Sequence, residues 1–179
     1  MIFSVPNENS MAKTESNAAN IFDTFAGEGK LELEGEKILS CEPDVGYLHR
    51  GMEKMAEGMT YLQYLPTVDR VDYVSGFFYS YAFAAAVEKL LKFEVPKRAN
   101  VIRVMLMELN RISSHLLWIG TYLLDLGAVS PFFYTFRERE MILRYFEKIS
   151  GQRLMYNYFV FGGVREDIFD LDDVRVLLD

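Results

Sequence analysis

The alternation of apolar and polar residues near the amino terminus is typical of β-structure. Leu31 and Leu33 alternate with charged neighbours, which is the two-residue period of a half-buried strand. Gly35-Glu36 then interrupts the pattern before a second short extended run. We therefore predict a β-hairpin with strands over about 29–34 and 37–41.

Apolar residues that recur every three or four positions predict helices over most of the remaining chain. A first helix is expected to begin near His49 and to end at Gly58, and a second to begin at Thr60. Pro66 predicts a break before a longer helix over about 68–92, because proline removes a backbone donor and clashes with the preceding turn.

The longest helical pattern runs from about 98 to 126. Another helix is predicted from Ser130-Pro131 to about 149, with Gly151 at its end. The aromatic and β-branched run over 155–161 predicts a strand, and a short helix is expected over 170–178. The apolar residues of the longest helix predict one buried stripe, made of Val101, Met105, Leu109, Ile112, Leu116, Ile119 and Leu123.

These elements predict a mostly helical α+β fold, an amino-terminal β-hairpin followed by a bundle of long helices. Residues 1–20 are polar and aperiodic and are expected to form a mobile segment. The chain has 179 residues, half of them hydrophobic, which is enough for one substantial core. We therefore expect residues 21–179 to form a single domain.

Composition excludes several classes of function. The chain carries 26 acidic against 19 basic residues and a net charge of -7, which argues against a nucleic-acid surface. Cys41 is the single cysteine, so a disulfide framework and a cysteine-only metal site are excluded, and a reducing compartment such as the cytosol is expected. No phosphate-loop motif occurs, so this chain is not predicted to bind a nucleotide itself.

No uninterrupted apolar run approaches the roughly 18 residues that a membrane-spanning helix needs. The first residues also lack the basic and apolar regions of a secretory signal. Any association with a membrane is therefore expected to be peripheral.

The stretch from Tyr47 to Ser75 is the most promising place for a functional site. It alternates charged residues with leucines, methionines and a valine. Because a buried charge costs several kcal/mol unless it is paired, such a stretch is either a paired core network or a site. The residues alone leave both interpretations open.

Several motifs resemble those of one family. They are GYLHRGMEKMAEGMTYLQYLP, DRVDYVSG, EVPKRANVIRVMLMELNRISSHLLW, LLDLGAVSPFFYTFRERE, and SGQR with a following FGGV. In this order and spacing they resemble the 49 kDa subunit family of NADH-quinone oxidoreductase, respiratory complex I, over residues about 30 to 167. The resemblance implies a truncated form of the hydrogenase large-subunit fold, and an amino-terminal portion, since family members are about twice this long.

The same resemblance implies a role in a larger complex. The chain would form part of a quinone-binding chamber beside the terminal iron-sulfur cluster of a partner subunit. Electron transfer to quinone would be coupled to ion translocation, and NAD binding is implied for the complex. The flavin and the iron-sulfur clusters would belong to partner subunits, including the iron-sulfur subunit beside the quinone, with the 30 kDa-type subunit and the membrane arm as further neighbours. The expected location is peripheral, at the cytoplasmic face of the cell membrane.

The resemblance also assigns roles to three residues. Tyr73 in DRVDYVS matches the tyrosine that binds the quinone head group, and a phenol is a suitable hydrogen-bond donor and proton source for a quinone carbonyl. Asp125 in LLDLGA matches the aspartate that supports a quinone-binding histidine. Arg50 in HRGMEK matches an arginine close to the cluster, where a cation stabilises the reduced state. Interpreted without the family, Tyr73 would fill a core, Asp125 would end a helix and Arg50 would pair with Glu53.

The chain departs from the family at three polar positions. The family places the quinone-binding histidine in a GPQHPxxHG loop before the hairpin, where this chain reads NIFDTFAGEGKLEL. Met155 stands where many members have a histidine, and Val160 where an arginine is usual. Together these changes support the alternative hypothesis, a non-catalytic structural remnant or truncated fragment that keeps only the contacts with its neighbours in the complex.

Other polar residues are interpreted as structural. Arg103, Glu108, Arg111 and His115 interrupt the longest helix and are expected to form ion pairs rather than a catalytic group. Nickel-iron hydrogenases of the same fold family hold their metal with paired CxxC motifs. The place of the first pair here reads PTVDRVDYVS and contains no cysteine, so hydrogenase activity is the least expected function within the fold family.

Overall fold

The computed structural model describes residues 28–44, 46, 49–168 and 174–175. The chain separates into two compact units. The first runs to Gly51 and includes Asp125–Ala128, and the second holds Met52–Leu124 and the residues from Val129 onward. The predicted mobile segment 1–20 lies outside the described residues, and the extent of the domain, 21–179, stays a prediction.

The first unit contains the predicted β-hairpin. Strands β1 (Glu28–Glu34) and β2 (Lys37–Asp44) pair antiparallel, with Leu31 opposite Cys41 and an irregularity between Glu32 and Leu33. Leu31 and Leu33 are buried, as their alternation predicted. Gly35 turns the chain at a φ of 63°, a conformation that glycine adopts without steric cost.

Two short helices open the second unit. Helix α2 spans Met52–Ala56 and helix α3 spans Tyr61–Val68. Thr60 caps α3 reciprocally with Gln63, which satisfies donors that the first helical turn leaves open. Pro66 lies inside α3, and the helix continues past it to Val68. The helix boundary that the sequence predicted at Pro66 is therefore in the wrong place.

Helix α4 spans Gly76–Leu91 and therefore does not begin at residue 68. Residues 69–75 instead form a succession of turns, which we call the 69–75 turn. The Asp72 carboxylate accepts a hydrogen bond from the Val74 amide at 3.0 Å, and the Ser75 amide donates to the Asp72 carbonyl. Such local bonds from an aspartate compete with helix formation. Lys92, in the left-handed conformation, ends α4 as predicted.

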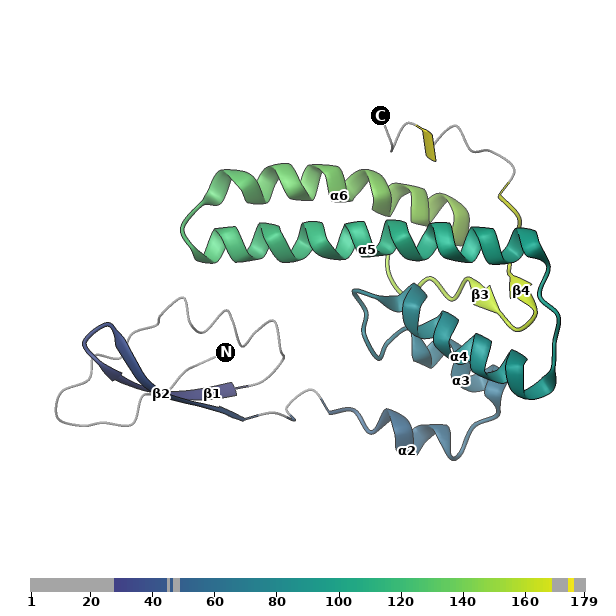
Figure 1. The fold of residues 1–179 in the computed structure, drawn as a ribbon, viewed down its shortest axis with the longest axis horizontal. Helices are drawn as coiled ribbons and strands as arrows, with labels where there is room; N and C mark the ends of the chain where they lie inside the picture. The colour runs from purple at the N-terminus through teal and green to yellow at the C-terminus, as the bar shows by residue number, and fades with distance from the viewer. Residues whose placement is uncertain (1–27, 45, 47–48, 169–173, 176–179) are drawn as a thin grey trace. The chain divides into compact units, whose positions relative to one another are not determined.

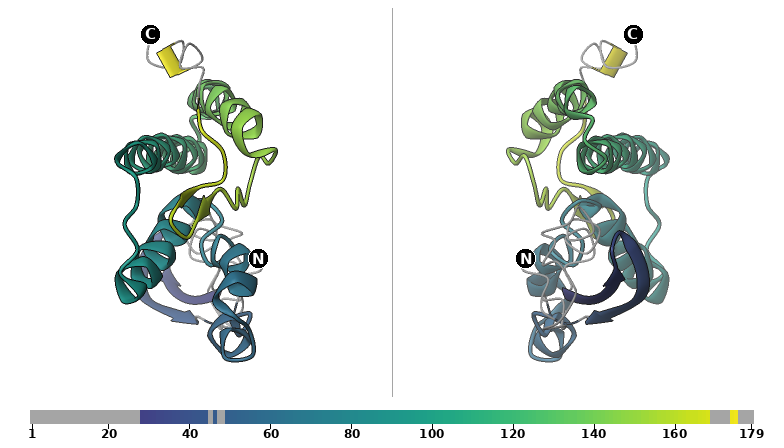
Figure 2. Two further views of the ribbon diagram at one scale, coloured as in Figure 1. Left: turned by 90° about the vertical axis from the view of Figure 1, so that its right-hand side faces the viewer. Right: turned by 90° about the vertical axis from the view of Figure 1, so that its left-hand side faces the viewer.

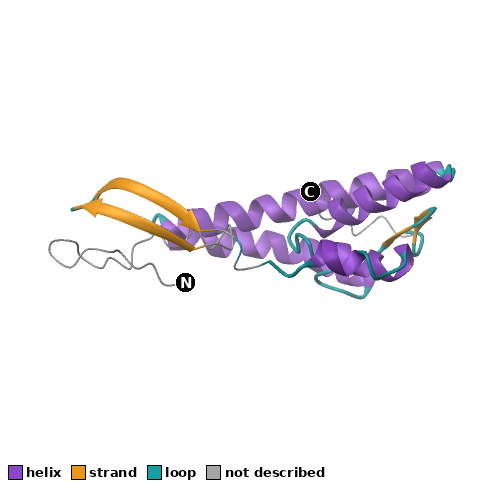
Figure 3. Cartoon of the chain, turned by 90° about the horizontal axis from the view of Figure 1, so that it is seen from below, coloured by secondary structure: helices purple, strands orange, loops and turns teal. Residues whose placement is uncertain are grey.

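Helices α5 (Lys97–Asp125) and α6 (Val129–Ser150) are antiparallel and lie side by side, as Figures 1 and 3 show. Gly120 allows a close approach, because a Cβ there would lie 2.3 Å from the Thr135 hydroxyl oxygen. The predicted buried stripe of α5 is shifted in phase. Of its members Leu109 is buried and Met105 and Leu116 pack partly buried against the core, whereas Val101 is 67% exposed. The face that packs instead combines apolar residues with small and polar ones: Ile102, Leu106, Asn110, Ser113 and Gly120.

The core of the second unit joins α4, α5, α6 and the segment that follows α6. Phe77 stacks on Tyr156 with ring centroids 4.2 Å apart and meets Phe146 edge to face. Aromatic pairs of this kind contribute about 0.5–1.5 kcal/mol beyond their burial. The fold class is thus the predicted one, mostly helical α+β with an amino-terminal hairpin.

The predicted strand over 155–161 is much shorter in the structure. Strands β3 (Phe159–Val160) and β4 (Gly163–Val164) form a small hairpin that packs beside α4 (Figure 2). Met155 and Asn157 adopt positive φ values of 58° and 45°, which interrupts an extended run. The helix predicted over 170–178 lies outside the described residues except Val174 and Arg175, which are helical. Among the described helices none is both long and apolar enough to cross a membrane.

Candidate functional site

The 69–75 turn carries Tyr73 and is held by contacts from three other elements. Asn110 of α5 donates from Nδ2 to the Val74 carbonyl at 2.9 Å. The Asp69 carboxyl group is hydrogen-bonded to the Ser80 hydroxyl of α4, and it accepts a hydrogen bond of 2.6 Å from the backbone amide of Asn157. Contacts on both sides of Tyr73 therefore fix the backbone from which its phenol projects.

Tyr73 and Asp69 face different environments. The Tyr73 side chain is 45% exposed, whereas Asp69 is 1% exposed. The sequence predicted that Asp69, Asp72 and Tyr73 share a helical face with Arg70 close by, and this is wrong because the segment is a turn. The exposed phenol is nevertheless accessible to a ligand or a partner.

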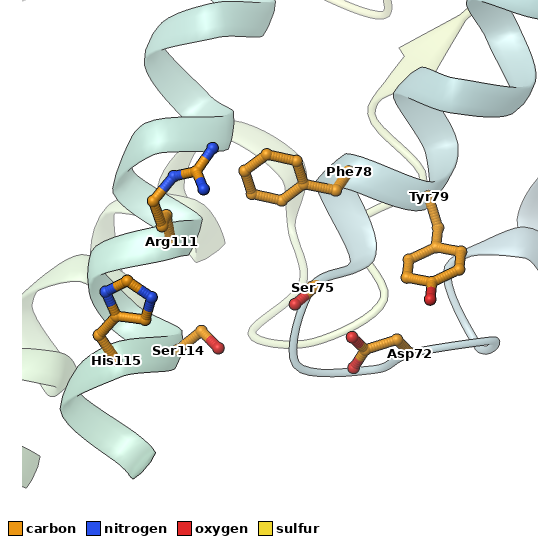
Figure 4. Close-up of a pocket in the computed structure, with 7 residues that line it drawn as sticks. All are labelled: Asp72, Ser75, Phe78, Tyr79, Arg111, Ser114 and His115. Atoms are coloured by element: carbon orange, nitrogen blue, oxygen red, sulfur yellow. The ribbon is translucent and has the colours of Figure 1, made fainter. Parts of the chain in front are cut away.

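A hollow of about 300 Å³ adjoins the turn (Figure 4). The turn and the start of α4 form one side, and α5 forms the other. Arg111 stacks over the Phe78 ring at 4.8 Å and pairs with Glu108 at 2.9 Å. The lining groups combine an acid, bases, hydroxyls and aromatic rings: Asp72, Ser75, Phe78, Tyr79, Arg111, Ser114 and His115.

A second, more apolar hollow continues along the same helix. His115 lines both hollows, and the second is otherwise lined by Ile112, Leu116, Trp118 and Ile119. A polar hollow that adjoins an apolar one suits a molecule with a polar head and an apolar body.

A buried ion pair lies elsewhere in the unit and is structural. Arg103 and Glu88 form two parallel hydrogen bonds, of 2.6 and 2.9 Å, with side chains 1% and 7% exposed. Arg103 also donates to the carbonyls of Val160 and Gly163, and the Gly162 amide donates to Glu88. Burial alone would raise the pKa of Glu88, but the Arg103 guanidinium and the Gly162 amide lower it overall. The ion-pairing interpretation of Arg103, and of Arg111 with Glu108, is confirmed.

Asp125 and Arg50 belong to the first unit, and Tyr73 to the second. Asp125 is the last residue of α5 and is half-buried, and Arg50 is exposed just before Gly51. Both residues make interactions in the structure. That the three residues serve one site stays a prediction.

The positions that depart from the family now have a structural setting. Met155 is half-buried in the left-handed conformation, and Val160 contributes its carbonyl to Arg103. Cys41 is exposed, and within the described ranges no group of three or more His, Cys, Asp or Glu side chains could hold a metal ion.

Three residues that hold the turn were not predicted from the sequence: Asn110, Ser80 and Asn157. Asn110 offered a weak signal, because it is a polar residue within an apolar helical pattern. In the structure it is 2% exposed, and a buried polar group needs a hydrogen-bond partner. Ser80 and Asn157 offered none, because their partner lies 11 and 88 positions away.

Comparisons with known proteins agree with the resemblance. The family model for the respiratory-chain NADH dehydrogenase, 49 Kd subunit, matches residues 125–175. An NADH-quinone oxidoreductase subunit of Campylobacter concisus is 56% identical over 78% of this chain and 34% of its own length. The protein of the same name from Campylobacter jejuni subsp. doylei is 51% identical over 83% of this chain and 37% of its own. A chloroplastic NAD(P)H-quinone oxidoreductase subunit of Marchantia polymorpha is 55% identical over 77% of this chain and 35% of its own.

Identity above half over more than three quarters of the chain shows common descent. The chain belongs to the 49 kDa subunit family of respiratory-chain NADH dehydrogenase. It spans about a third of the length of the curated relatives that it matches.

Proposed function

We propose that this chain forms part of the quinone-binding chamber of a complex I-type NADH-quinone oxidoreductase, with Tyr73 as a hydrogen-bond donor to the quinone head group. The observation that carries the proposal is the exposed phenol of Tyr73 on a turn that Asn110 and Asp72 fix on its carboxyl side. The names of the relatives, which are quinone oxidoreductase subunits, give it independent support.

The contribution of Tyr73 follows from the charge that develops during reduction. A quinone oxygen gains negative charge as it accepts electrons, so a hydrogen bond from the phenol is stronger in the transition state than in the ground state. The hydroxyl can also supply a proton to that oxygen. A fixed backbone limits the movement of the donor and so reduces the entropic cost of binding.

The two hollows that share His115 offer polar and apolar surface beside the turn that carries Tyr73, although Tyr73 itself lines neither of them. Ser75 and Ser114 supply hydroxyls at the polar end, and Ile112 and Trp118 supply apolar surface at the other. In this proposal the quinone is the substrate and no cofactor is bound covalently.

The remaining roles in the proposal come from the family. Arg50 would lie beside the terminal iron-sulfur cluster of the neighbouring subunit, where its charge favours the reduced cluster. Asp125 would support the quinone site without the loop histidine. Flavin and NAD binding and ion translocation would belong to the rest of the complex, including the 30 kDa-type subunit and the membrane arm, at the cytoplasmic face of the membrane.

The test is the Tyr73→Phe variant in the assembled complex. Loss of the donor should weaken transition-state stabilisation by about 1.5–3 kcal/mol, roughly tenfold to a hundredfold in quinone reduction. Tyr134→Phe, an exposed tyrosine of α6, is the matched control and should leave turnover unchanged. Turnover that is equal in both variants would contradict the proposal and favour a purely structural role. An iron-sulfur subunit should also co-purify with the chain under gentle extraction.

A further inference from the structure

Asp69 is buried in the turn that carries Tyr73 and is not used in the proposal above. It is 1% exposed, and no described basic side chain forms an ion pair with it. Arg70, the next residue, is exposed and lowers the pKa of Asp69 through its charge. This differs from Glu88, whose buried charge is matched by Arg103. An unmatched carboxylate in such a place costs several kcal/mol, and protonation removes that cost.

The hydrogen bonds around Ser80 indicate which protonation state of the Asp69 carboxyl group is consistent with the geometry. The Ser80 hydroxyl lies within hydrogen-bond distance of two oxygens, Asp69 Oδ1 and, at 2.6 Å, the Gly76 carbonyl. A hydroxyl has one hydrogen and can form a well-aligned hydrogen bond to only one of them. If Asp69 were ionised, one of the two contacts would bring lone pairs together.

A proton on Asp69 resolves this conflict. The carboxylic acid then donates from Oδ1 to Ser80 Oγ, and Ser80 donates to the Gly76 carbonyl. Asp69 Oδ2 still accepts from the Asn157 amide at 2.6 Å. Every polar group of the cluster is then satisfied, as buried polar groups normally are.

The surrounding charges agree with this assignment. Burial is the largest influence on Asp69 and raises its pKa, against smaller opposite effects of Ser80, the Asn157 amide and Arg70. From the segment after α6, Tyr156 interacts electrostatically with Asp69, and its own burial raises the pKa of its phenol to about 12, so it stays neutral. Arg139 of α6 and Arg153 act on Tyr156 rather than directly on Asp69.

We infer that Asp69 is a positioning residue that holds a proton and, in this neutral form, ties the Tyr73 turn to α4 and to Asn157. Its bearing on quinone reduction rests on the function proposed above, whereas its protonation state does not. When Asp69 is ionised, Ser80 Oγ faces two acceptor oxygens, Asp69 Oδ1 and the Gly76 carbonyl, with one hydrogen between them, and the turn is held less tightly. Rising pH should therefore weaken both the fold and the placing of Tyr73.

The first test needs only the 179-residue chain. Asp69→Asn keeps the proposed bonds, since its amide donates to Ser80 and its oxygen accepts from Asn157. The infrared spectrum near neutral pH should contain a protonated-carboxyl band that is absent from Asp69→Asn and present in the matched variant Asp72→Asn. In urea, the unfolding midpoint of the wild type should decrease relative to that of Asp69→Asn as the pH rises through the raised pKa of Asp69, because the folded state binds the extra proton. A wild type without the band, or with a pH profile parallel to that of Asp69→Asn, would overturn the inference.

The second test uses the assembled complex. Asp69→Asn should reduce quinone within about twofold of the wild-type rate and lose its decline at high pH, while Asp69→Ala should lose about tenfold or more. Asp69→Asn that is as poor as Asp69→Ala would show that the charged form is needed, against the inference. A Tyr73→Phe variant with unchanged turnover would contradict the proposed quinone role of Tyr73. The protonation of Asp69 would still be decided by the infrared and urea measurements alone.

Discussion

Asn110 Nδ2 lies 2.9 Å from the carbonyl oxygen of Val74, so that the middle of α5 fixes the residue directly after Tyr73. The Asn110 side chain is 2% exposed, and its Oδ1 is buried without a hydrogen-bond partner in the described structure. The Asn110 amide therefore donates one hydrogen bond that holds the turn, while its Oδ1 is a buried acceptor without a donor in the described structure.

The first prediction concerns this bond. Asn110→Ala removes the donor and leaves the Val74 carbonyl unpaired, which should lower the free energy of unfolding by about 1–3 kcal/mol. Asn100→Ala changes an exposed asparagine of the same helix and should stay within about 0.5 kcal/mol of the wild type. Urea unfolding followed by circular dichroism measures both. Equal stability of the two variants would show that the bond is not formed in solution.

A second prediction compares Asp125 with Tyr73 in the assembled complex. Asp125→Asn should lower quinone reduction much less than the roughly tenfold to hundredfold loss expected for Tyr73→Phe. The reason is that the aspartate would normally act through a loop histidine, and this chain has none before His49. Steady-state turnover with a soluble quinone measures the contrast. The reverse ranking would place the head group elsewhere and give Asp125 a proton path of its own.

The third prediction concerns the acid sensitivity of the fold. The pKa of Glu88 is lowered in the folded state from its usual 4.5, because Arg103 and the Gly162 amide outweigh its burial. A lowered carboxyl pKa stabilises the fold above the unfolded-state value, and this stabilisation is lost as the pH falls through the folded-state value. The urea midpoint of the wild type should therefore fall between about pH 5 and about pH 3 more steeply than that of Glu88→Gln.

The Glu88–Arg103 pair also allows a test of what it costs to leave one buried charge without its partner. Glu88→Gln leaves Arg103 buried and unpaired, which should cost about 3–5 kcal/mol at neutral pH. The double variant Glu88→Gln/Arg103→Met removes both charges and should be less destabilised than the single one. A double variant that is as unstable as the sum of the separate changes would mean that the two side chains act independently.

The fourth prediction is self-association of the chain in solution. Large apolar side chains are exposed along α5 and α6, and contiguous patches of this kind usually mark an interface or an aggregation risk. Sedimentation should show a mass that rises with concentration, and Trp118→Ser/Phe133→Ser should reduce the rise. A monomer at all concentrations with a cooperative thermal transition would contradict this. The exposed residues include Val101, Val104, Ile112, Trp118, Ile119, Tyr122, Phe133, Tyr134 and Met141.

The sequence predicted the elements whose signals are local. The hairpin, the limits of α5 and the end of α6 follow from alternation, period and Gly151. The phase of α5 was missed because its packed face uses Gly120 and Ser113, which allow close approach, while large residues such as Val101 point outward. The start of α4 was missed because one side-chain bond from Asp72 replaces a helical turn.

The site was only partly predictable for the same reason. Tyr73 was singled out through the family motif and not through its surroundings. Its supports come from Asn110 and Asn157, at separations of tens of residues along the chain, and no spacing rule connects them. Asp69 was noticed but placed on a helical face, whereas it is buried in a turn.

The hydrogen bonds from Arg103 to the β3–β4 hairpin imply that the hairpin closes after helices α4 and α5 have formed. This two-residue ladder has few hydrogen bonds of its own, and its backbone is held by Glu88 and Arg103 across 57 to 74 positions. During synthesis, helices α4 and α5 emerge first, and local helical contacts form much faster than distant ones. We therefore expect the Arg103–Glu88 pair to stay open to water until the residues beyond Gly163 have left the ribosome. Closure of the hairpin over this pair is therefore a late folding step of the second unit, and changes at Gly162 should slow it more than changes within α5.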